Sequence, residues 1–252
     1  SSYTLGEIAK RYQQILERLR LEGLANKNKL LPAPFDIQNV LVLAPENAAG
    51  LGDFKKDADA LAQAGVCQFI YHTATFQGNT AAVSMVESLA TGLTQWAKNF
   101  NAAPDLIVII RGGGAVNDLA YLDDYPLAAF LCKCSVPVWV GIGHEKDRTI
   151  LDEIAHRSFD TPSKVIGGIR NLIVERIQRV LQSHQTIKLL SQHQIAAYQS
   201  QNDQYIKVIK TLAQNQINTT QQTLELIKGN SQYFAQQQIK LASTQVESLL
   251  RE

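Results

Sequence analysis

From Asn171 onward, glycine and proline nearly vanish from the chain and glutamine becomes abundant. Apolar residues recur in this stretch at spacings of three and four, from Ile173 to Ile227. A narrow apolar seam of this kind is typical of a coiled coil. A straight helix as far as Gly229 would be about 90 Å long at 1.5 Å per residue. No globular core can bury such a helix, so it must pair with another one.

The sequence therefore predicts a long helical coiled-coil arm over residues 169–252, which we expect to be only partial. Gly229–Asn230 is the best candidate for a hairpin turn, after which the chain would run back. Glutamine-rich sequence is often disordered, but the regular seam favours a helix. In isolation the unburied seam is expected to make the chain a homo-oligomer or to pair the arm with itself.

Ahead of the arm, four short apolar runs alternate with helical patterns between residues 36 and 168. The runs are NVLVLAP (39–45), VCQFIYHTATF (66–76), PDLIVII (104–110) and VPVWVGIG (136–143). Strands that are apolar throughout and alternate with helices are typical of a parallel sheet covered on both faces. We predict an α/β domain over 36–168, with a mostly parallel sheet flanked by helices. Residues 1–35 are predicted to form a leading helix and a proline-stiffened linker.

Composition narrows the class of protein. The 24 basic and 23 acidic residues leave a formal charge of +1, which excludes a globally basic nucleic-acid coat but not a local cationic site. Cys67, Cys132 and Cys134 are odd in number and lie in apolar segments, as expected of a reduced intracellular protein. The CKC pair has no second pair to complete a metal site. No apolar run approaches a membrane span of about 20 residues, so we expect a cytoplasmic protein.

Two strand ends carry charged or glycine-rich sequence. In an open parallel sheet, ligands bind beyond the carboxyl ends of the strands. One strand runs into Arg111 and the three glycines Gly112, Gly113 and Gly114. Free backbone N–H groups and a guanidinium suit a phosphate or another oxyanion. The loop matches neither a Walker motif nor a dinucleotide fingerprint, and a simple tight turn is the alternative.

The next strand runs into His144, which we predict to open a helical run, EKDRTILDEIAH. Asp147 would then share the first turn and one helix face with His144, where its carboxylate could orient the imidazole. The alternative is that Glu145 and Asp147 are ordinary first-turn acids, which leaves the histidine unexplained. The other histidines are weaker candidates: His72 is expected to be structural, and His184 and His193 solvated. His156 is expected to end its helix, where a cation is favourable.

The motifs RGGGAVNDL, VPVWVGIGHEKDRTILD and DTPS, in this order, resemble the exodeoxyribonuclease VII large-subunit family. The resemblance covers Tyr12 to about Gly168 by motif and the arm by architecture. It implies a nuclease that degrades single-stranded DNA to oligonucleotides from either end. It also implies a coiled-coil arm that binds several copies of a small helical subunit.

By this resemblance the family's catalytic residues fall on Arg111, His144, Asp147 and, in the loop APENAAGLGD, Asp53. Several positions depart from the family pattern: Ala115 replaces a serine, Asn117 a glutamate, and Glu46–Asn47 a Thr-Gly pair. The spacing to Asp53 is also longer. The chain is expected to lack the OB-fold that precedes the catalytic domain in the family, and hence to bind DNA weakly by itself.

The interpretation is a phosphodiester hydrolase in which Arg111 and the glycine backbone hold the scissile phosphate. His144 would be the acid or base, Asp147 would orient it, and Asp53 would help to position water or substrate. No cofactor is expected to be required, although a Mg²⁺ site built from Asp53 and Asp147 is an alternative. A non-catalytic assembly protein with a degenerate nuclease domain is the main alternative function. A nucleotide-binding transferase would need a base pocket that the sequence does not indicate.

Overall fold

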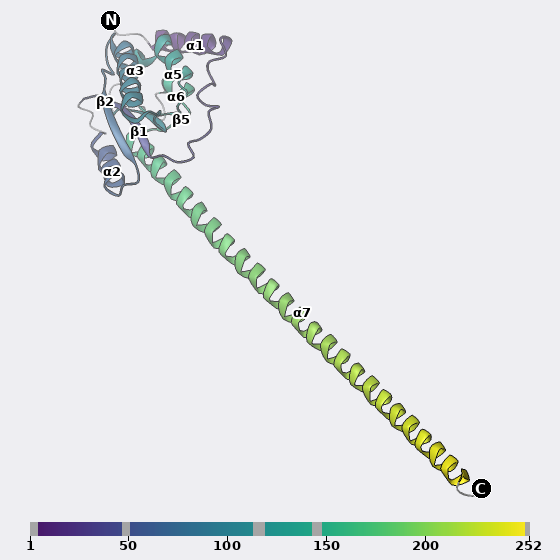
Figure 1. Cartoon of the computed structure of the whole chain (residues 1–252). Helices are drawn as coiled ribbons and strands as arrows, with labels where there is room; N and C mark the ends of the chain where they lie inside the picture. Colours follow the sequence, from purple (N-terminus) through teal and green to yellow (C-terminus); the bar gives the residue numbers. More distant parts are fainter. Residues whose placement is uncertain (1–4, 47–50, 113–118, 143–147, 250–252) are drawn as a thin grey trace. The chain divides into compact units, whose positions relative to one another are not determined.

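The computed structural model describes residues 5–46, 51–112, 119–142 and 148–249 of the chain. It divides into two compact units, residues 1–180 and residues 181–252. The sequence instead placed divisions at 35 and 168. Figure 1 shows the elements of each unit along the chain.

The first unit is built on a five-stranded parallel sheet with the strand order β2-β1-β3-β4-β5. Its strands are β1 (Asn39–Ala44), β2 (Gln68–Thr73), β3 (Leu106–Ile110), β4 (Val138–Gly141) and β5 (Arg157–Ser158). All four pairings are parallel, which confirms the predicted fold class and the four predicted strands. The sequence missed β5, because its two exposed residues, an arginine and a serine, carry no apolar pattern.

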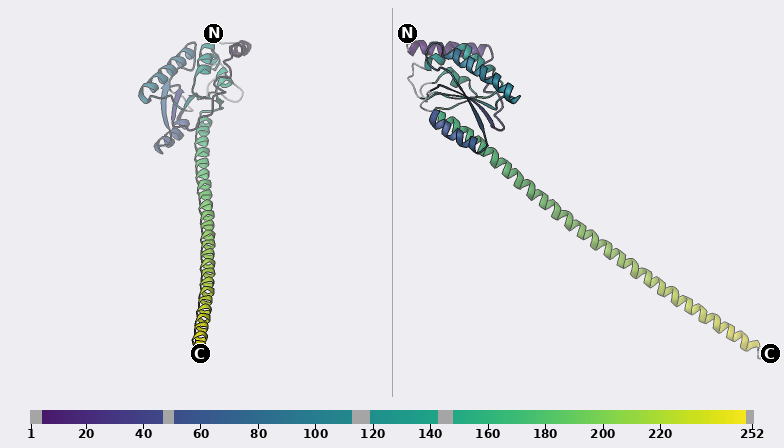
Figure 2. Two further views of the ribbon diagram at one scale, coloured as in Figure 1. Left: turned by 45° about the vertical axis from the view of Figure 1, so that its right-hand side comes forward. Right: turned by 60° about the vertical axis from the view of Figure 1, so that its left-hand side comes forward.

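Helices cover both faces of the sheet. They are α1 (Leu5–Leu21), α2 (Leu51–Gln63), α3 (Ala81–Phe100), α5 (Tyr125–Lys133), α6 (Ile150–Ile154), a short 3₁₀ helix η1 (Ala120–Leu122), and the first turns of α7 (Pro162–Leu249). In Figure 2 (right), α2 and the start of α7 lie on one side of the sheet and α1 and α3 on the other. No helix in the described part of the chain is long and apolar enough to cross a membrane.

Alternate residues of each central strand enter two separate cores. Leu41, Ile107 and Val140 point into the core under α1, α3, α5 and α6. Val42 and Val108 point into the other core, where they meet the buried α7 residues. Because successive side chains of a strand point to opposite faces, a strand covered on both faces must be apolar throughout. This explains the continuous apolar runs in the sequence.

The leading segment is packed into the first unit. Leu19 of α1 is fully buried in the first core. Asn28, also buried, donates to the carbonyl of Val136 (2.9 Å) and accepts the N–H groups of Val138 (2.9 Å) and His156 (3.2 Å). One amide side chain thus ties this segment to β4 and to the residue preceding β5, so the described residues 5–35 pack with the sheet.

The DTPS turn starts α7. Pro162 is its first residue, and the backbone N–H of Lys164 donates to Thr161 Oγ1 (3.3 Å). A threonine cap followed by proline is a favoured helix start, since proline lacks an N–H that would have no partner there. Val165 and Ile169 are then buried in the second core, so the beginning of the long helix belongs to the globular unit.

The second unit is the continuation of α7 as a single helix, which supports the predicted long helical arm. Its apolar side chains are exposed, including Ile195, Ile209 and Leu224. The helix runs through Gly229 and Asn230, where the sequence suggested a turn. A glycine inside a helix costs only about 0.5–1 kcal/mol, and Leu226 and Lys228 just before this one are good helix formers. A pair of residues favourable for a turn is therefore not enough to break the helix.

Candidate active site

The candidate site lies at the carboxyl edge of the sheet. The carboxyl ends of β1, β3 and β4 are neighbours at this edge. The strand order reverses between β1 and β3, since β2 lies on one side of β1 and the later strands on the other. In open parallel sheets, ligands bind in the crevice at such a point. The residues that follow β1, β3 and β4 are therefore the ones to consider.

Arg111 directly follows β3 and is buried, with 5% of its surface exposed. Its backbone N–H donates to the carbonyl of Gly141, the last residue of β4, at 3.2 Å. The two strands whose ends carry the predicted site residues are thus hydrogen-bonded neighbours, as a shared site requires. An arginine held by the fold at a strand end presents its charge without the entropy loss of ordering a long surface side chain.

Of five further predicted site residues, the structure describes one. Gly112 is described and buried next to Arg111. Gly113, Gly114, His144 and Asp147 lie outside the described residues. Their roles stay predictions. The described residues on each side place the two segments at the ends of neighbouring strands.

The predicted helix after His144 starts later than expected. The helix α6 begins at Ile150, with Thr149 as its cap. Both the backbone N–H and the hydroxyl of Thr149 donate to Asp152 Oδ2 at 2.8 Å. Thr-x-x-Asp is a capping-box pattern, which the sequence analysis overlooked. One continuous helix over the run EKDRTILDEIAH is therefore wrong, whereas the relation of Asp147 to His144 lies outside the described residues and stays a prediction.

Asp53 lies in the first turn of α2, where its side chain is exposed. Because α2 follows β1, the neighbour of β3, this turn starts from the same edge as Arg111. An acidic residue is also favourable there for a purely local reason, since it complements the helix dipole. The catalytic assignment of Asp53 therefore stays a prediction.

Sequence reasoning missed a buried carboxylate beside the site. Asp123, which follows η1, is 3% exposed and accepts the N–H of Ile150 at 2.7 Å. Burial raises the pKa of this carboxyl to about 6, although the hydrogen bond from Ile150 and the charge of Arg11 act in the opposite direction. The adjacent Asp124 caps α5 through the N–H of Leu127 (3.2 Å). The Asp-Asp-Tyr-Pro sequence indicated a helix start, but nothing local shows which aspartate is buried.

His72 is structural and His184 and His193 are solvated, as predicted, whereas His156 does not end a helix, because α6 ends at Ile154. The ring of His72 packs on Gly92, where an added Cβ would lie 3.1 Å from it. His156 accepts from the indole N–H of Trp139 at Nδ1 (3.3 Å) and has Nε2 3.1 Å from the carbonyl of Leu31. Its ring thus links β4 to the leading segment. His184 and His193 are exposed on α7.

The cysteines carry no reactive thiol. All three are free, and burial raises the pKa of Cys67 to about 12 and that of Cys132 and Cys134 to about 11. Thiols held protonated in this way are poor nucleophiles and poor metal ligands. Within the described ranges no group of three His, Cys, Asp or Glu side chains could hold a metal. Asp147, half of the alternative Mg²⁺ site, lies outside those ranges.

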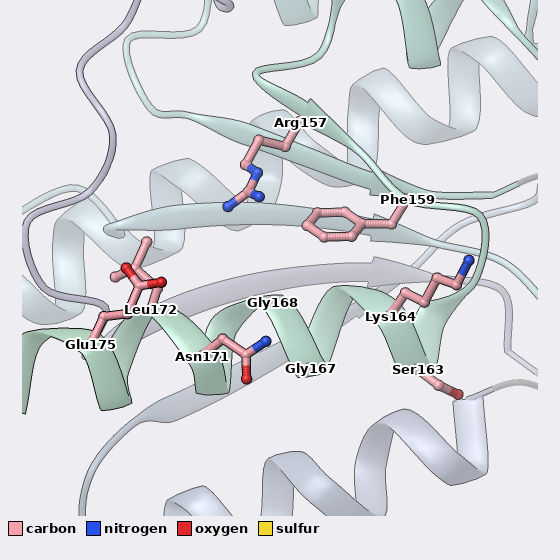
Figure 3. Close-up of a pocket in the computed structure, with 9 residues that line it drawn as sticks. All are labelled: Arg157, Phe159, Ser163, Lys164, Gly167, Gly168, Asn171, Leu172 and Glu175. Carbon is pink, nitrogen blue, oxygen red and sulfur yellow. The ribbon is translucent and has the colours of Figure 1, made fainter.

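A groove of about 550 Å³ lies between β5 and the first turns of α7. The guanidinium of Arg157 lies 5.0 Å from the ring centroid of Trp139 and 5.3 Å from that of Phe159. Lys164 and Glu175 lie toward opposite ends of the groove (Figure 3). Because its walls carry both signs of charge, the lining does not select an anionic or a cationic ligand.

Comparison with known proteins decides the family. A model of the family described as "Exonuclease VII, large subunit" matches residues 24–252. The chain belongs to the exonuclease VII large-subunit family. This confirms the resemblance drawn from the RGGG, GHEKD and TPS motifs. The match covers both the sheet domain and the arm.

Three curated relatives named exodeoxyribonuclease 7 large subunit illustrate the match. The protein from Deinococcus radiodurans is 41% identical over 186 residues, which are 74% of this chain and 44% of the relative. The protein from a Nostoc species is 29% identical over 97% of this chain and 60% of its own length, and one from Helicobacter pylori is 31% identical over 74% and 44%. The chain thus spans about half the length of the exonuclease VII large subunits that it matches.

Proposed function

We propose that this chain carries the nuclease centre of an exonuclease VII large subunit, which hydrolyses phosphodiester bonds of single-stranded DNA to oligonucleotides. The observation that carries the proposal is the family match over residues 24–252. This range contains the buried Arg111, bonded through its backbone to the end of β4. A cytoplasmic location belongs to the same proposal.

In this proposal, Arg111 and the backbone of Gly112–Gly114 hold the scissile phosphate and stabilise the charge that develops on it. His144 transfers the proton as general acid or base, and Asp147 orients its ring. Asp53, from the first turn of α2, helps to position water or the substrate. A guanidinium and an imidazole supply these steps without a metal. A Mg²⁺ ion on Asp53 and Asp147 is the competing arrangement.

The proposed partner is a small helical subunit that packs on the apolar seam of the arm. The long run of exposed apolar side chains on α7 supports a helical partner, since such a surface is costly to leave in water. Without that partner, the seam is proposed to pair with a second copy of the chain.

The test is hydrolysis of end-labelled single-stranded DNA by the enzyme assembled with its small subunit, with and without excess EDTA. We expect activity to survive EDTA. His144→Ala should abolish activity, and Arg111→Lys should lower it severely, because a point charge cannot replace a bidentate fork. His193→Ala, which changes an exposed histidine on the face of α7 opposite the seam, is the matched control and should keep full activity.

Each contrary result identifies a different error. An inactive wild-type enzyme that still binds the small subunit would favour the assembly-protein alternative, to which Ala115 and Asn117 point. Loss of activity in EDTA, restored by Mg²⁺, would favour the metal site. An active His144→Ala enzyme would contradict the assignment of the acid or base.

A further inference from the structure

Two segments at the carboxyl edge are fastened to each other at both ends. One segment leaves β3 at Arg111 and reaches Asp123, and the other leaves β4 at Gly141 and reaches Ile150. Where they begin, the N–H of Arg111 donates to the carbonyl of Gly141 (3.2 Å). Where they end, the N–H of Ile150 donates to Asp123 Oδ1 (2.7 Å). The first bond belongs to the sheet, whereas the second depends on one side chain.

Asp123 is held firmly enough to act as an anchor. The 3₁₀ helix η1 that precedes it is buried through Ala120 and Leu122, which pack in the first core. Ile150 is itself fully buried, and Thr149 before it is locked by Asp152. Asp152 in turn accepts the hydroxyl of Ser158 (2.7 Å), which connects this point to β5. The end of the second segment therefore cannot shift unless the Asp123 hydrogen bond breaks.

The surroundings of Asp123 are charged on several sides. Arg11 of α1 and Asp152 of α6 act on its carboxyl electrostatically, and Tyr12 of α1 is affected by it in turn. Arg11 also pairs with Asp124 (3.5 Å). The leading helix thus faces the same junction as α6. A carboxylate that accepts a backbone N–H in such a site forms a stronger hydrogen bond than a neutral acceptor.

We propose that Asp123 is a positioning residue of the nuclease centre: its carboxylate holds Ile150, where the segment that leaves β4 ends, against the end of the segment that leaves β3. The expected effect of Asp123 on catalysis rests on the proposed function. Asp123 follows η1 in the chain and contacts the segment from β4 through the N–H of Ile150. A misplacement of about 1 Å in a supporting residue can cost about 100-fold in rate.

The variants separate geometry from charge. Asp123→Asn keeps an acceptor oxygen at the same place without the charge. Asp123→Glu keeps the charge but moves the acceptor by one methylene group. Asp123→Ala removes both. Asp124→Ala is the matched control, because it deletes the neighbouring aspartate and the cap of α5 but leaves Ile150 bound.

In the assembled enzyme, Asp123→Ala and Asp123→Glu should lower kcat on single-stranded DNA by about 10- to 100-fold, with KM nearly unchanged. Asp123→Asn should retain most of kcat, and so should Asp124→Ala despite a lower Tm. Equal kcat in Asp123→Ala and wild type would overturn the proposal. So would an Asn variant that loses as much activity as the Glu variant; this comparison still decides if the Ala variant does not fold.

Hydrogen exchange of the Ile150 amide provides a readout that is independent of nuclease activity. We expect faster exchange at Ile150 in Asp123→Ala than in wild type, Asp123→Asn or Asp124→Ala. Unchanged protection in Asp123→Ala would overturn the role of Asp123. If no variant, including wild type, hydrolyses DNA while the exchange pattern holds, the proposed function fails and the structural tie between the two segments stands.

Discussion

Arg111 and Asp123 are two charged side chains that the fold buries beside its candidate site. Charged residues are rarely buried without partners, because leaving water is costly for the charged form. For Asp123 this cost appears as a pKa raised to about 6, chiefly by burial. A residue that is unfavourable for stability but placed next to a candidate site is a reasonable candidate for function.

The raised pKa predicts how stability depends on pH. A carboxyl whose folded pKa lies above its unfolded value near 3.8 contributes stability below pH 4, which is lost as pH rises through about 6. The asparagine of the Asp123→Asn variant cannot ionise. Above pH 6 the free energy of unfolding of this variant should therefore be about 2–3 kcal/mol higher than that of the wild type. The difference should disappear toward pH 4. Urea unfolding of both proteins between pH 4 and pH 8 measures it, and a constant difference would contradict the buried ionisation.

At the scale of the elements, the close approach of β4 and α7 positions the site. A Cβ added at Gly141 would lie 2.5 Å from Val165 Cγ2 and 3.1 Å from the carbonyl oxygen of Thr161. The carboxyl end of β4 thus passes directly against the start of α7, and only glycine fits. The same residue receives the N–H of Arg111, so the packing of α7 and the alignment of the candidate site depend on one backbone position.

Gly141→Ala should therefore lower the free energy of unfolding by about 1–3 kcal/mol, because α7 or β4 must shift. Gly167→Ala is the matched control on α7, where an added Cβ meets nothing within 4 Å. It should stabilise the protein by about 0.5–1 kcal/mol, the usual gain when alanine replaces glycine in a helix. Thermal and urea unfolding compare the two. Equal effects would mean that α7 does not pack on Gly141 as described.

At the scale of the whole molecule, the chain consists of a globular unit that buries its own core and a helical unit that does not. In residues 181–252, apolar side chains such as Ile195, Ile209 and Leu224 are more than half exposed. Local hydrogen bonds support the helix, for example from Gln214 to Asn218 (3.1 Å). Such contacts stabilise a helix by only a few tenths of a kcal/mol each. A partner surface is therefore needed to cover the seam.

Light scattering over a concentration series should show self-association of the chain in the absence of other subunits. Ile195→Glu combined with Ile209→Glu places two charges on the seam and should shift the equilibrium to the monomer, since buried unpaired charges are costly. Gln204→Glu with Gln222→Glu adds the same charge on the opposite helix face and should leave association unchanged. A wild-type chain that stays monomeric at every concentration would contradict the prediction.

Patterns within a few residues were enough to predict the α/β class, four of the strands, the helices between them and the long C-terminal helix. Strand and helix periodicities depend on near neighbours, so they are visible in a single chain. The spaced motifs also identified the family, because their order and spacing can be read directly from the sequence. The same patterns misplaced the start of α6, where Thr149 and Asp152 form the cap.

Only the tertiary structure supplied the strand order, the two-residue β5 and the burial of Asp123. It also decided that Asn28 joins the leading segment to β4 and that Gly141 faces α7. Each of these depends on which distant segments meet. Hydrogen bonds such as Ile150 to Asp123 join residues whose separation in sequence is too large and too irregular for any local pattern. The energy of such a contact exists only once both segments are packed, and the sequence of either one does not contain it.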